Sequence, residues 1–307
     1  MKHVTTLDRQ AVLADISARL DALEVSLQRP PATEEEESVI AARRLNRASG
    51  MLASSVLLDS AIEHYRGSFK NKAMLTPLVV SSLSLAVSAH GSADRRPLAH
   101  RIRQAVYGAG AATGIVGSCF HLYNVLKRPG GLAWQNLFYG APLGAPWAIL
   151  LSGLLGTAAE EVRNSPPGRA HVLGLNAGRL LALVSGAGLL GTTAEAGLLH
   201  FRGAYHDPFM FAPVTIPPAG GLLLLNAAAF PSRRRRPFER LWMQLVALLG
   251  FVGMGFHIWG VQRNMGGWRN WSQNVLNGPP IPAPPSFTGL ALAGLAALGL
   301  LEERPHG

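Results

Sequence analysis

The chain has 307 residues, of which 48% are hydrophobic and only 15% are charged, well below the roughly 25% of charged residues in an average soluble domain. The formal net charge is +10, and the single cysteine, Cys119, excludes an intrachain disulfide, a c-type haem attachment and a cysteine-rich metal cluster. The basic residues stand mainly in short stretches between apolar runs, a pattern typical of cytoplasmic loops. We therefore expect a membrane protein that has no nucleic-acid partner.

The first 30 residues predict a soluble amphipathic helix and lack the apolar block of a secretory signal peptide. Apolar residues recur at intervals of three and four and form one narrow seam: Leu13, Ile16, Leu20, Leu23 and Leu27. This seam would pack against the protein's own body, against a partner protein or against a second copy in a dimer. Pro30, Pro31 and the acidic run 34–37 predict a solvated linker, so residues 1–44 form an N-terminal cytoplasmic helix with an acidic linker.

Eight apolar segments follow, and they predict an all-α polytopic membrane protein with eight transmembrane helices. Their approximate spans are 46–63, 73–90, 104–126, 142–159, 180–200, 209–230, 240–262 and 285–301. A hydrocarbon core about 30 Å thick needs about 20 helical residues, and the third, fifth, sixth and seventh segments satisfy this well. The first segment is the weakest because it is rich in serine and contains Asp59, and the fourth and eighth segments are short.

The distribution of Lys and Arg between the loops predicts the orientation. The loops after the second, fourth and sixth segments contain twelve basic residues, including Arg95, Arg96, Arg101, Arg103 and the run 233–236, whereas the opposite loops contain eight. Because cytoplasmic loops collect positive charge, we expect both termini on the cytoplasmic side of a bacterial-type inner membrane. The loops after the first, third, fifth and seventh segments then face outward.

Two phrases in these outward loops, EHYRGSFKNKAMLTPL (63–78) and LHFRGAYHDPFMFAPV (199–214), match at an offset of 136 residues. The same offset relates GIVGSCFHLY (114–123) to GFVGMGFHIW (250–259). Several short identities at one offset predict a tandem duplication of a four-helix unit. Because four crossings return the chain to the same side, residues 45–165 and 166–307 would form parallel repeats, related by a pseudo-twofold axis along the membrane normal.

Residues that persist in both copies are the best candidates for function. They are the histidines His64, His121, His200 and His257, the arginines Arg66 and Arg202, and the acids Asp59 and Glu195. A carboxylate inside a membrane helix costs about 2.5–3.5 kcal/mol on insertion scales, so we expect both acids to face the bundle interior or water. Each acid lies five residues before its histidine, about 140° away on the helical wheel, so an acid and its own histidine do not share one face.

The leading hypothesis is an integral membrane redox subunit with a histidine-based site near the outward face. Neutral imidazole ligates haem iron and transition metals. His64 with His121, and His200 with His257, would each hold one b-type haem. Alternatively, the four histidines and the two acids would hold metal ions near the pseudo-twofold axis.

A quinone is a further candidate for the same layer of residues. Histidine, arginine and carboxylate groups bind quinone carbonyls and move protons, so Asp59, Glu195, Arg66 and Arg202 are candidate catalytic residues. Eight helices in two sets of four resemble the quinol-oxidising membrane subunits of polysulfide-reductase-type complexes. The resemblance lies in helix count alone and assigns no residue a role.

Two other classes of function stay open. Duplicated halves and intramembrane acids are usual in secondary transporters, in which Asp59 and Glu195 would carry protons or bind a cation. In a membrane anchor or scaffold for a partner protein, the histidines would bond to backbone carbonyls and the His-aromatic-Arg-Gly phrase would shape a tight turn.

Overall fold

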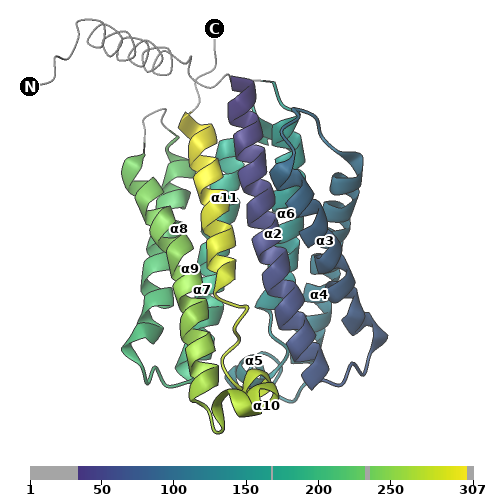
Figure 1. Cartoon of the computed structure of the whole chain (residues 1–307), viewed down its shortest axis with the longest axis vertical. Helices are drawn as coiled ribbons and strands as arrows, with labels where there is room; N and C mark the ends of the chain where they lie inside the picture. Colours follow the sequence, from purple (N-terminus) through teal and green to yellow (C-terminus); the bar gives the residue numbers. More distant parts are fainter. Residues whose placement is uncertain (1–33, 167–168, 232–235, 303–307) are drawn as a thin grey trace, which may run out of the picture.

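A computed structural model describes residues 34–166, 169–231 and 236–302 of the chain. Within these ranges the protein consists mainly of long α-helices that run up and down along one common axis (Figure 1). The long helices are α2 (Glu34–Arg66), α3 (Thr76–Ala93), α4 (Arg101–Leu126), α6 (Gly144–Arg163), α7 (Ala177–Arg202), α8 (Ala212–Ala229), α9 (Pro237–Arg263) and α11 (Pro285–Glu302). Each of the eight predicted apolar segments overlaps one of these helices over most of its length.

Short elements connect the long helices. Two short helices, α5 (Trp134–Tyr139) and α10 (Trp271–Asn277), lie at the end of the molecule opposite the start of α2 (Figure 1). Single 3-10 turns precede α3, α8 and α10: η1 (Lys72–Leu75), η2 (Pro208–Phe211) and η3 (Gly267–Asn270). A two-stranded antiparallel hairpin, β1 (His171–Val172) and β2 (Leu175–Asn176), joins α6 to α7.

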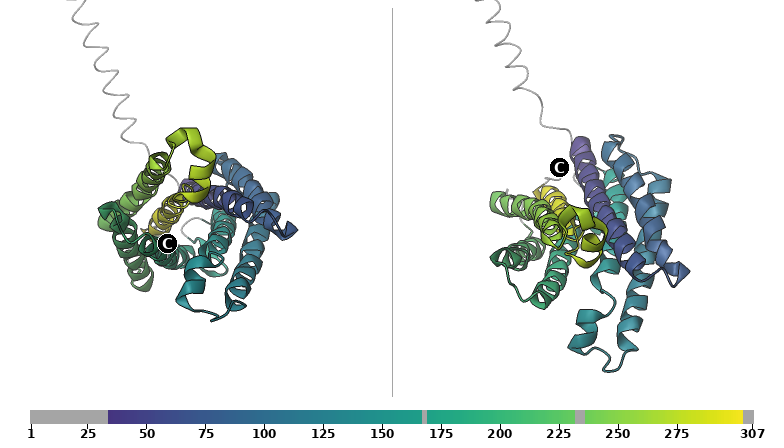
Figure 2. Two further views of the ribbon diagram at one scale, coloured as in Figure 1. Left: turned by 90° about the horizontal axis from the view of Figure 1, so that it is seen from below. Right: turned by 60° about the horizontal axis from the view of Figure 1, so that its bottom comes forward.

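The helices form two groups of four that have the same order of neighbours. In the first group, α2 and α4 each pack against α3 and α6; in the second, α7 and α9 each pack against α8 and α11. The groups meet where α2 packs against α11 and α6 against α7 (Figure 2). The main hydrophobic core lies at this junction. The apolar helix α11 is buried on nearly all sides, as expected for a helix that is hydrophobic all round.

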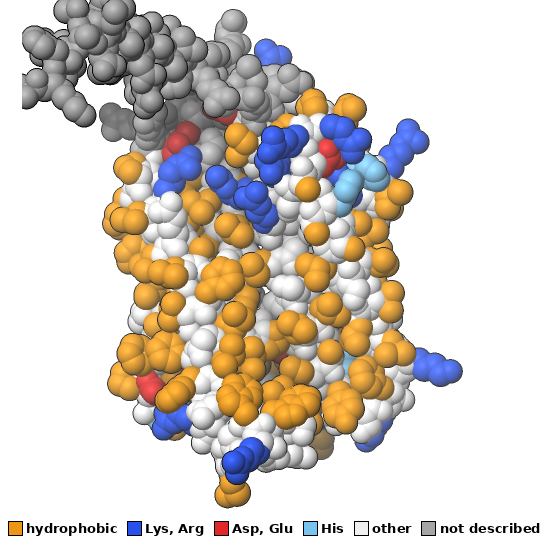
Figure 3. Space-filling view, in the orientation of Figure 1, with side chains coloured by type: hydrophobic (Ala, Val, Ile, Leu, Met, Phe, Trp, Pro, Cys, Tyr) orange, Lys and Arg blue, Asp and Glu red, His pale blue; other side chains and the backbone are white. Residues whose placement is uncertain are grey.

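Six of the helices in the described ranges are long and apolar enough to cross a bilayer: α4, α7, α9, α11, and α3 and α8 together with their 3-10 turns. The other two long helices, α2 and α6, are less apolar, and they pack against each other and against the second group. Figure 3 shows a broad belt of hydrophobic side chains, with Lys and Arg side chains gathered toward the two ends. These are the features of an all-α, multi-pass membrane protein.

The loops that carry the repeated phrases have the same local backbone. Ser68 and Phe69 adopt φ angles of 56° and 45°, and Ala204 and Tyr205 adopt the same two values. The side chain of Asn71 caps η1 by accepting from Ala73 N, and Asp207 caps η2 by accepting from Phe209 N. The two glycine pairs that follow α4 and α9, residues 130–131 and 266–267, also have positive φ angles at both positions.

The first helix begins earlier than predicted. α2 starts at Glu34, so the acidic run expected in a linker forms its first turn, and the boundary expected between residues 44 and 45 falls inside this helix. Negative side chains stabilise a helix N-terminus because they interact favourably with its partial positive charge. The amphipathic helix predicted for residues 1–30 lies outside the described residues.

Candidate functional site

The four shared histidines lie near the ends of α2, α4, α7 and α9, at the end of the molecule opposite the start of α2. The Nδ1 atom of each ring is within hydrogen-bond distance of one backbone carbonyl oxygen. The partners are Met74 for His64 at 2.6 Å, Met210 for His200 at 2.8 Å, Pro142 for His121 at 2.5 Å and Pro280 for His257 at 2.6 Å. Since a carbonyl oxygen only accepts, Nδ1 carries a proton in each ring, and in the neutral form of the ring Nε2 carries the lone pair.

The histidines are arranged as one pair in each helix group. His64 lies close enough to His121 for a charge on one ring to act on the other, and His200 is related to His257 in the same way. Among the described residues no group of three or more His, Cys, Asp or Glu side chains is placed to hold one metal ion.

The repeated His-aromatic-Arg-Gly phrase folds into a turn that fastens the end of one helix to the next. In the first copy, Phe69 N donates to His64 O at 3.0 Å, and His64 then donates to Met74 O in η1. The second copy repeats both bonds through Tyr205, His200 and Met210. The glycine of the phrase packs closely against the methionine of the same loop: a Cβ atom at Gly67 or at Gly203 would lie 3.1 Å from the methionine Cε, a contact that a small shift of this flexible side chain relieves.

The two shared arginines have different surroundings. Arg66 forms an exposed ion pair with Glu63 at 2.7 Å, and Glu63 has Leu199 as its counterpart in the second copy. Arg202 instead donates to Phe138 O at 3.1 Å and stacks 4.8 Å from the centre of the Tyr139 ring. Arg202 has no ion pair with any described residue.

The two shared acids lie on helices that border the junction of the helix groups, one in each group. Asp59 on α2 and Glu195 on α7 are both half-buried, and they lie within electrostatic range of each other. Glu195 Oε1 also accepts from Gly144 N, at the start of α6, at 3.1 Å. The residue that corresponds to Gly144 in the second copy is Pro282, which has no N–H to donate, and Ser55 donates to its carbonyl oxygen.

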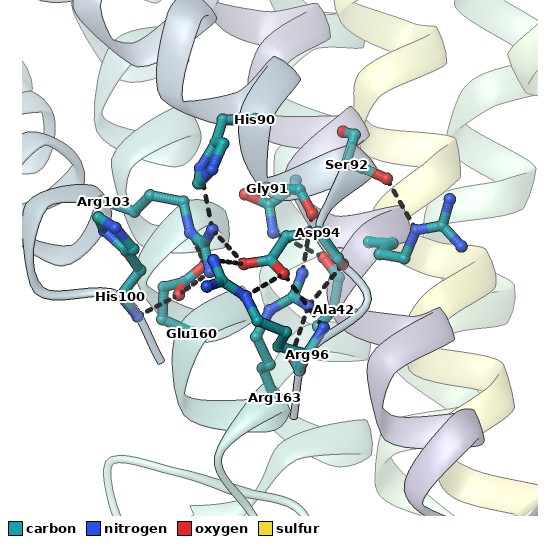
Figure 4. A network of polar contacts seen from close by, with 12 residues as sticks. Ala42, His90, Gly91, Ser92, Asp94, Arg96, His100, Arg103, Glu160 and Arg163 are labelled. Carbon is teal, nitrogen blue, oxygen red and sulfur yellow. Dashed lines mark hydrogen bonds and ion pairs between the residues drawn. The ribbon is translucent and has the colours of Figure 1, made fainter. Parts of the chain in front are cut away.

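A buried ion cluster at the opposite end of the first helix group was not predicted. Arg103 donates from Nε and Nη2 to the two carboxylate oxygens of Glu160, both at 2.8 Å, and from Nη1 to Asp94 at 2.8 Å (Figure 4). The side chains of Arg103 and Glu160 are at most 1% exposed. Nearby, the buried Arg163 donates to the carbonyl oxygens of Gly91, Asp94 and Arg96.

This cluster corrects the role assigned to Arg103, which the loop count treats as one of the solvated cytoplasmic charges. Arg103 stands inside the bundle because the carboxylates of Glu160 and Asp94 compensate its charge, and a buried charge needs such partners. The second group has a similar pair, in which Arg240 donates to Glu302 at 2.7 Å, and it is more exposed. The feature of the sequence that could have revealed these ion pairs is the acidic residue at the end of the last apolar segment of each half, Glu160 and Glu302.

Asp94, in the loop after α3, is the acid of this cluster that lies outside the apolar helices. Hydrogen bonds from Arg96 and Arg103 hold the pKa of its carboxyl group far below the usual range, although burial opposes them. Its carboxylate oxygens accept from Arg96 N, Arg96 Nε and Arg103 Nη1. Asp94 is therefore ionised across the physiological pH range and ties the loop to α4.

The interior of the first helix group is polar, whereas that of the second is apolar. The Tyr107 hydroxyl group donates to Asn46 Oδ1 at 2.5 Å and lies 3.1 Å from Ser88 Oγ, which in turn bonds to Ser49. The buried α3 face of Ser81, Ser84, Ser88 and Gly91 corresponds, at the same offset, to Pro217, Gly220, Leu224 and Ala227 on α8. Met243 stands in place of Tyr107. The two helix groups thus have interiors with different chemistry.

No protein family, curated protein or solved structure matches this chain. The roles of its residues therefore have to be argued from their geometry.

Proposed function

We propose that the eight long helices cross the membrane as two parallel four-helix repeats, with both termini in the cytoplasm of a bacterial-type inner membrane. The matched order of helix packing and the matched loop geometry support this layout. Residues 1–30 would then offer their apolar seam on the cytoplasmic side to a partner protein or a second copy.

The topology has a direct test. Cys119 is exposed and its counterpart is Gly255, so Cys119→Gly provides a cysteine-free background. In that background, Lys70→Cys should react with a membrane-impermeant maleimide added to intact cells, and Arg95→Cys should react only after the cells are opened. The reverse pattern would overturn the orientation.

For function, we propose a membrane redox subunit in which each repeat holds one b-type haem or one metal ion between its two histidines, near the outward face. The observation that carries the proposal is the set of four Nδ1–carbonyl hydrogen bonds. A bond of this kind fixes the ring and its tautomer and is the usual second interaction of a metal-ligating histidine. It leaves the four Nε2 lone pairs as donors to the metal.

The chain's own residues would orient the ligands and control access to the site. Met74 and Met210 hold His64 and His200 through their carbonyl oxygens, and the glycine turns fasten these loops to the helix ends. A haem held by two histidines would supply one-electron transfer. A quinone at the same layer would be the alternative redox partner, with Arg66, Arg202, Asp59 and Glu195 as its binding and proton-carrying groups.

The optical spectrum of the purified protein tests this proposal. We expect a Soret band whose intensity falls by about half with His64→Ala or His121→Ala, and which is lost when His200→Ala is added. His206→Ala is the matched control, because His206 lies in the same outward loop and its counterpart is Lys70. If the spectrum shows no haem band, metal analysis finds no bound metal and quinone does not bind, the redox proposal fails.

A proton- or cation-coupled transporter is the second candidate, and the position of Asp59 and Glu195 within electrostatic range of each other, one from each helix group, favours it. Secondary transporters place their sites between repeats, and these two carboxylates come from different repeats. Coupled uptake in vesicles should disappear with Asp59→Asn or Glu195→Gln. Glu63→Gln is the control, since Glu63 pairs with Arg66 at the surface; unchanged uptake in the two test variants would exclude this candidate.

A further inference from the structure

An apolar crevice opens between α5 and α7, at the outward end of the molecule. It has a volume of about 450 Å³ and is lined by Trp134, Phe138, Leu198 and Phe201. The rings of Phe138 and Phe201 stack with their centroids 5.9 Å apart, and Trp134 and Phe201 are mostly exposed. A volume in the range of about 300–1,000 Å³ is typical of ligand sites, and this lining suits a hydrocarbon chain.

The guanidinium group of Arg202 lies at the rim of this crevice, and no acidic group among the described residues pairs with it. Arg202 follows Phe201 in α7 and donates to the carbonyl oxygen of Phe138, so the guanidinium group borders two of the lining residues. That carbonyl and the Tyr139 ring offer it no full negative charge. Its counterpart Arg66 is neutralised by Glu63, and the crevice has Leu198 and Phe201 where the first copy has Ile62 and Tyr65.

We infer that the crevice and Arg202 together bind an anionic phospholipid, with an acyl chain against the aromatic side chains and the phosphate on the guanidinium group. Arginine is suited to phosphate because its planar N–H donors match the phosphate oxygens. A guanidinium group without an acidic partner favours a charged phosphate over the neutral carbonyl of a quinone. The inference does not depend on metal ligation by the histidines.

Lipid retention measures this site directly. The full-length protein is placed in nanodiscs made from equal amounts of phosphatidylglycerol and phosphatidylcholine, released, and analysed by native mass spectrometry. We expect wild type to retain phosphatidylglycerol preferentially. Arg202→Gln should reduce that preference about fivefold, the ratio that corresponds to roughly 1 kcal/mol for one basic residue near a membrane surface.

Three variants separate the site from general attraction of lipid to a basic protein. Arg66→Gln, the matched change in the first copy, should leave the preference unchanged. Phe201→Ala should reduce retention of phospholipids of either charge, because it removes part of the crevice wall. Arg202→Lys keeps the charge but loses the planar donor pattern, so its preference should lie between those of wild type and Arg202→Gln; it also serves if Arg202→Gln loosens α5.

Three outcomes would overturn the inference. Equal losses with Arg66→Gln and Arg202→Gln would mean nonspecific attraction. Unchanged retention in Arg202→Gln and Phe201→Ala would mean that lipid binds elsewhere. Recovery of a quinone in place of the phospholipid would assign the crevice to a neutral ring.

Discussion

Glu195 of α7 accepts a hydrogen bond from the backbone N–H of Gly144, the first residue of α6, at 3.1 Å. The bond joins the two helix groups, because the acid belongs to the second and the glycine to the first. It also places a carboxylate at a helix N-terminus, where the helix dipole favours negative charge. The approach is possible because Gly144 has no side chain: a Cβ atom there would overlap the Glu195 carboxylate.

We therefore expect Gly144→Ala to destabilise the protein by about 1–3 kcal/mol, the usual range for forcing extra atoms into a packed site. The measurement is the thermal unfolding midpoint in detergent. The double variant Gly144→Ala with Glu195→Ala should recover part of the loss, since the shortened side chain makes room. Gly108→Ala is the control, because a Cβ atom at Gly108 meets open space. Equal stability of Gly144→Ala and wild type would contradict this reading.

The two Arg–Glu pairs should differ in their contribution to stability. Glu160→Gln breaks a pair whose side chains are at most 1% exposed, and loss of one partner of a buried pair costs about 3–5 kcal/mol. Glu302→Gln breaks a pair whose side chains are 32% and 16% exposed; because solvent reaches this pair, its loss should cost less, toward the roughly 0–1 kcal/mol of fully exposed pairs. Unfolding of both variants in the same detergent would show the difference, and a cost for Glu302→Gln as large as that for Glu160→Gln would disprove the distinction.

Stability should depend on pH through Asp94. Because its pKa is lowered in the folded protein, its contribution is complete above the unfolded pKa of about 3.9 and is lost as the pH falls toward the folded pKa. Asp94→Asn should therefore lower the unfolding midpoint at neutral pH, and its difference from wild type should shrink below about pH 4. Asp207→Asn is the control, since the matching position in the first copy already has asparagine, Asn71. A difference that stays constant down to pH 3 would refute the role of Asp94.

The buried hydroxyl group of Tyr107 should contribute more to stability than the side chain of Met243, which occupies the matching position in the second helix group. Tyr107→Phe removes the hydroxyl group that donates to Asn46, and an unsatisfied buried acceptor costs about 1–3 kcal/mol. Met243→Leu, the conservative change at the matching position, should cost less than about 1.5 kcal/mol. Tyr107→Phe with wild-type stability would show that Asn46 finds another donor.

Much of the architecture was predictable because its signals are local. Apolar runs located the long helices, and six of those in the described ranges are long and apolar enough to span a bilayer. The phrases around His64 and His200 predicted matching local structure, and their loops indeed have matching φ angles. The start of α2 was predicted too late, because an acidic run suits both a solvated linker and a helix N-terminus, and only its continuation into α2 distinguishes them.

The candidate site was predicted less completely because its contacts join residues distant in sequence. His64 and His200 were identified by repetition, but their bonds to the carbonyl oxygens of Met74 and Met210 depend on how η1 and η2 fold back. Arg103 was counted among the loop charges, because nothing near it in the sequence shows that Glu160 lies beside it.

The sequence by itself determined the all-α membrane class and the approximate positions of the long helices, because hydropathy and the length of apolar runs are properties of the chain alone. The tertiary structure decided which charged groups lie near one another. Asp59 and Glu195, two groups of the same sign, lie within electrostatic range, Arg103 pairs with Glu160, and Arg202 has no acidic partner among the described residues. The physical reason is that the free energy of a charge in a low-dielectric interior depends on the groups within a few ångströms, and helix packing selects those groups.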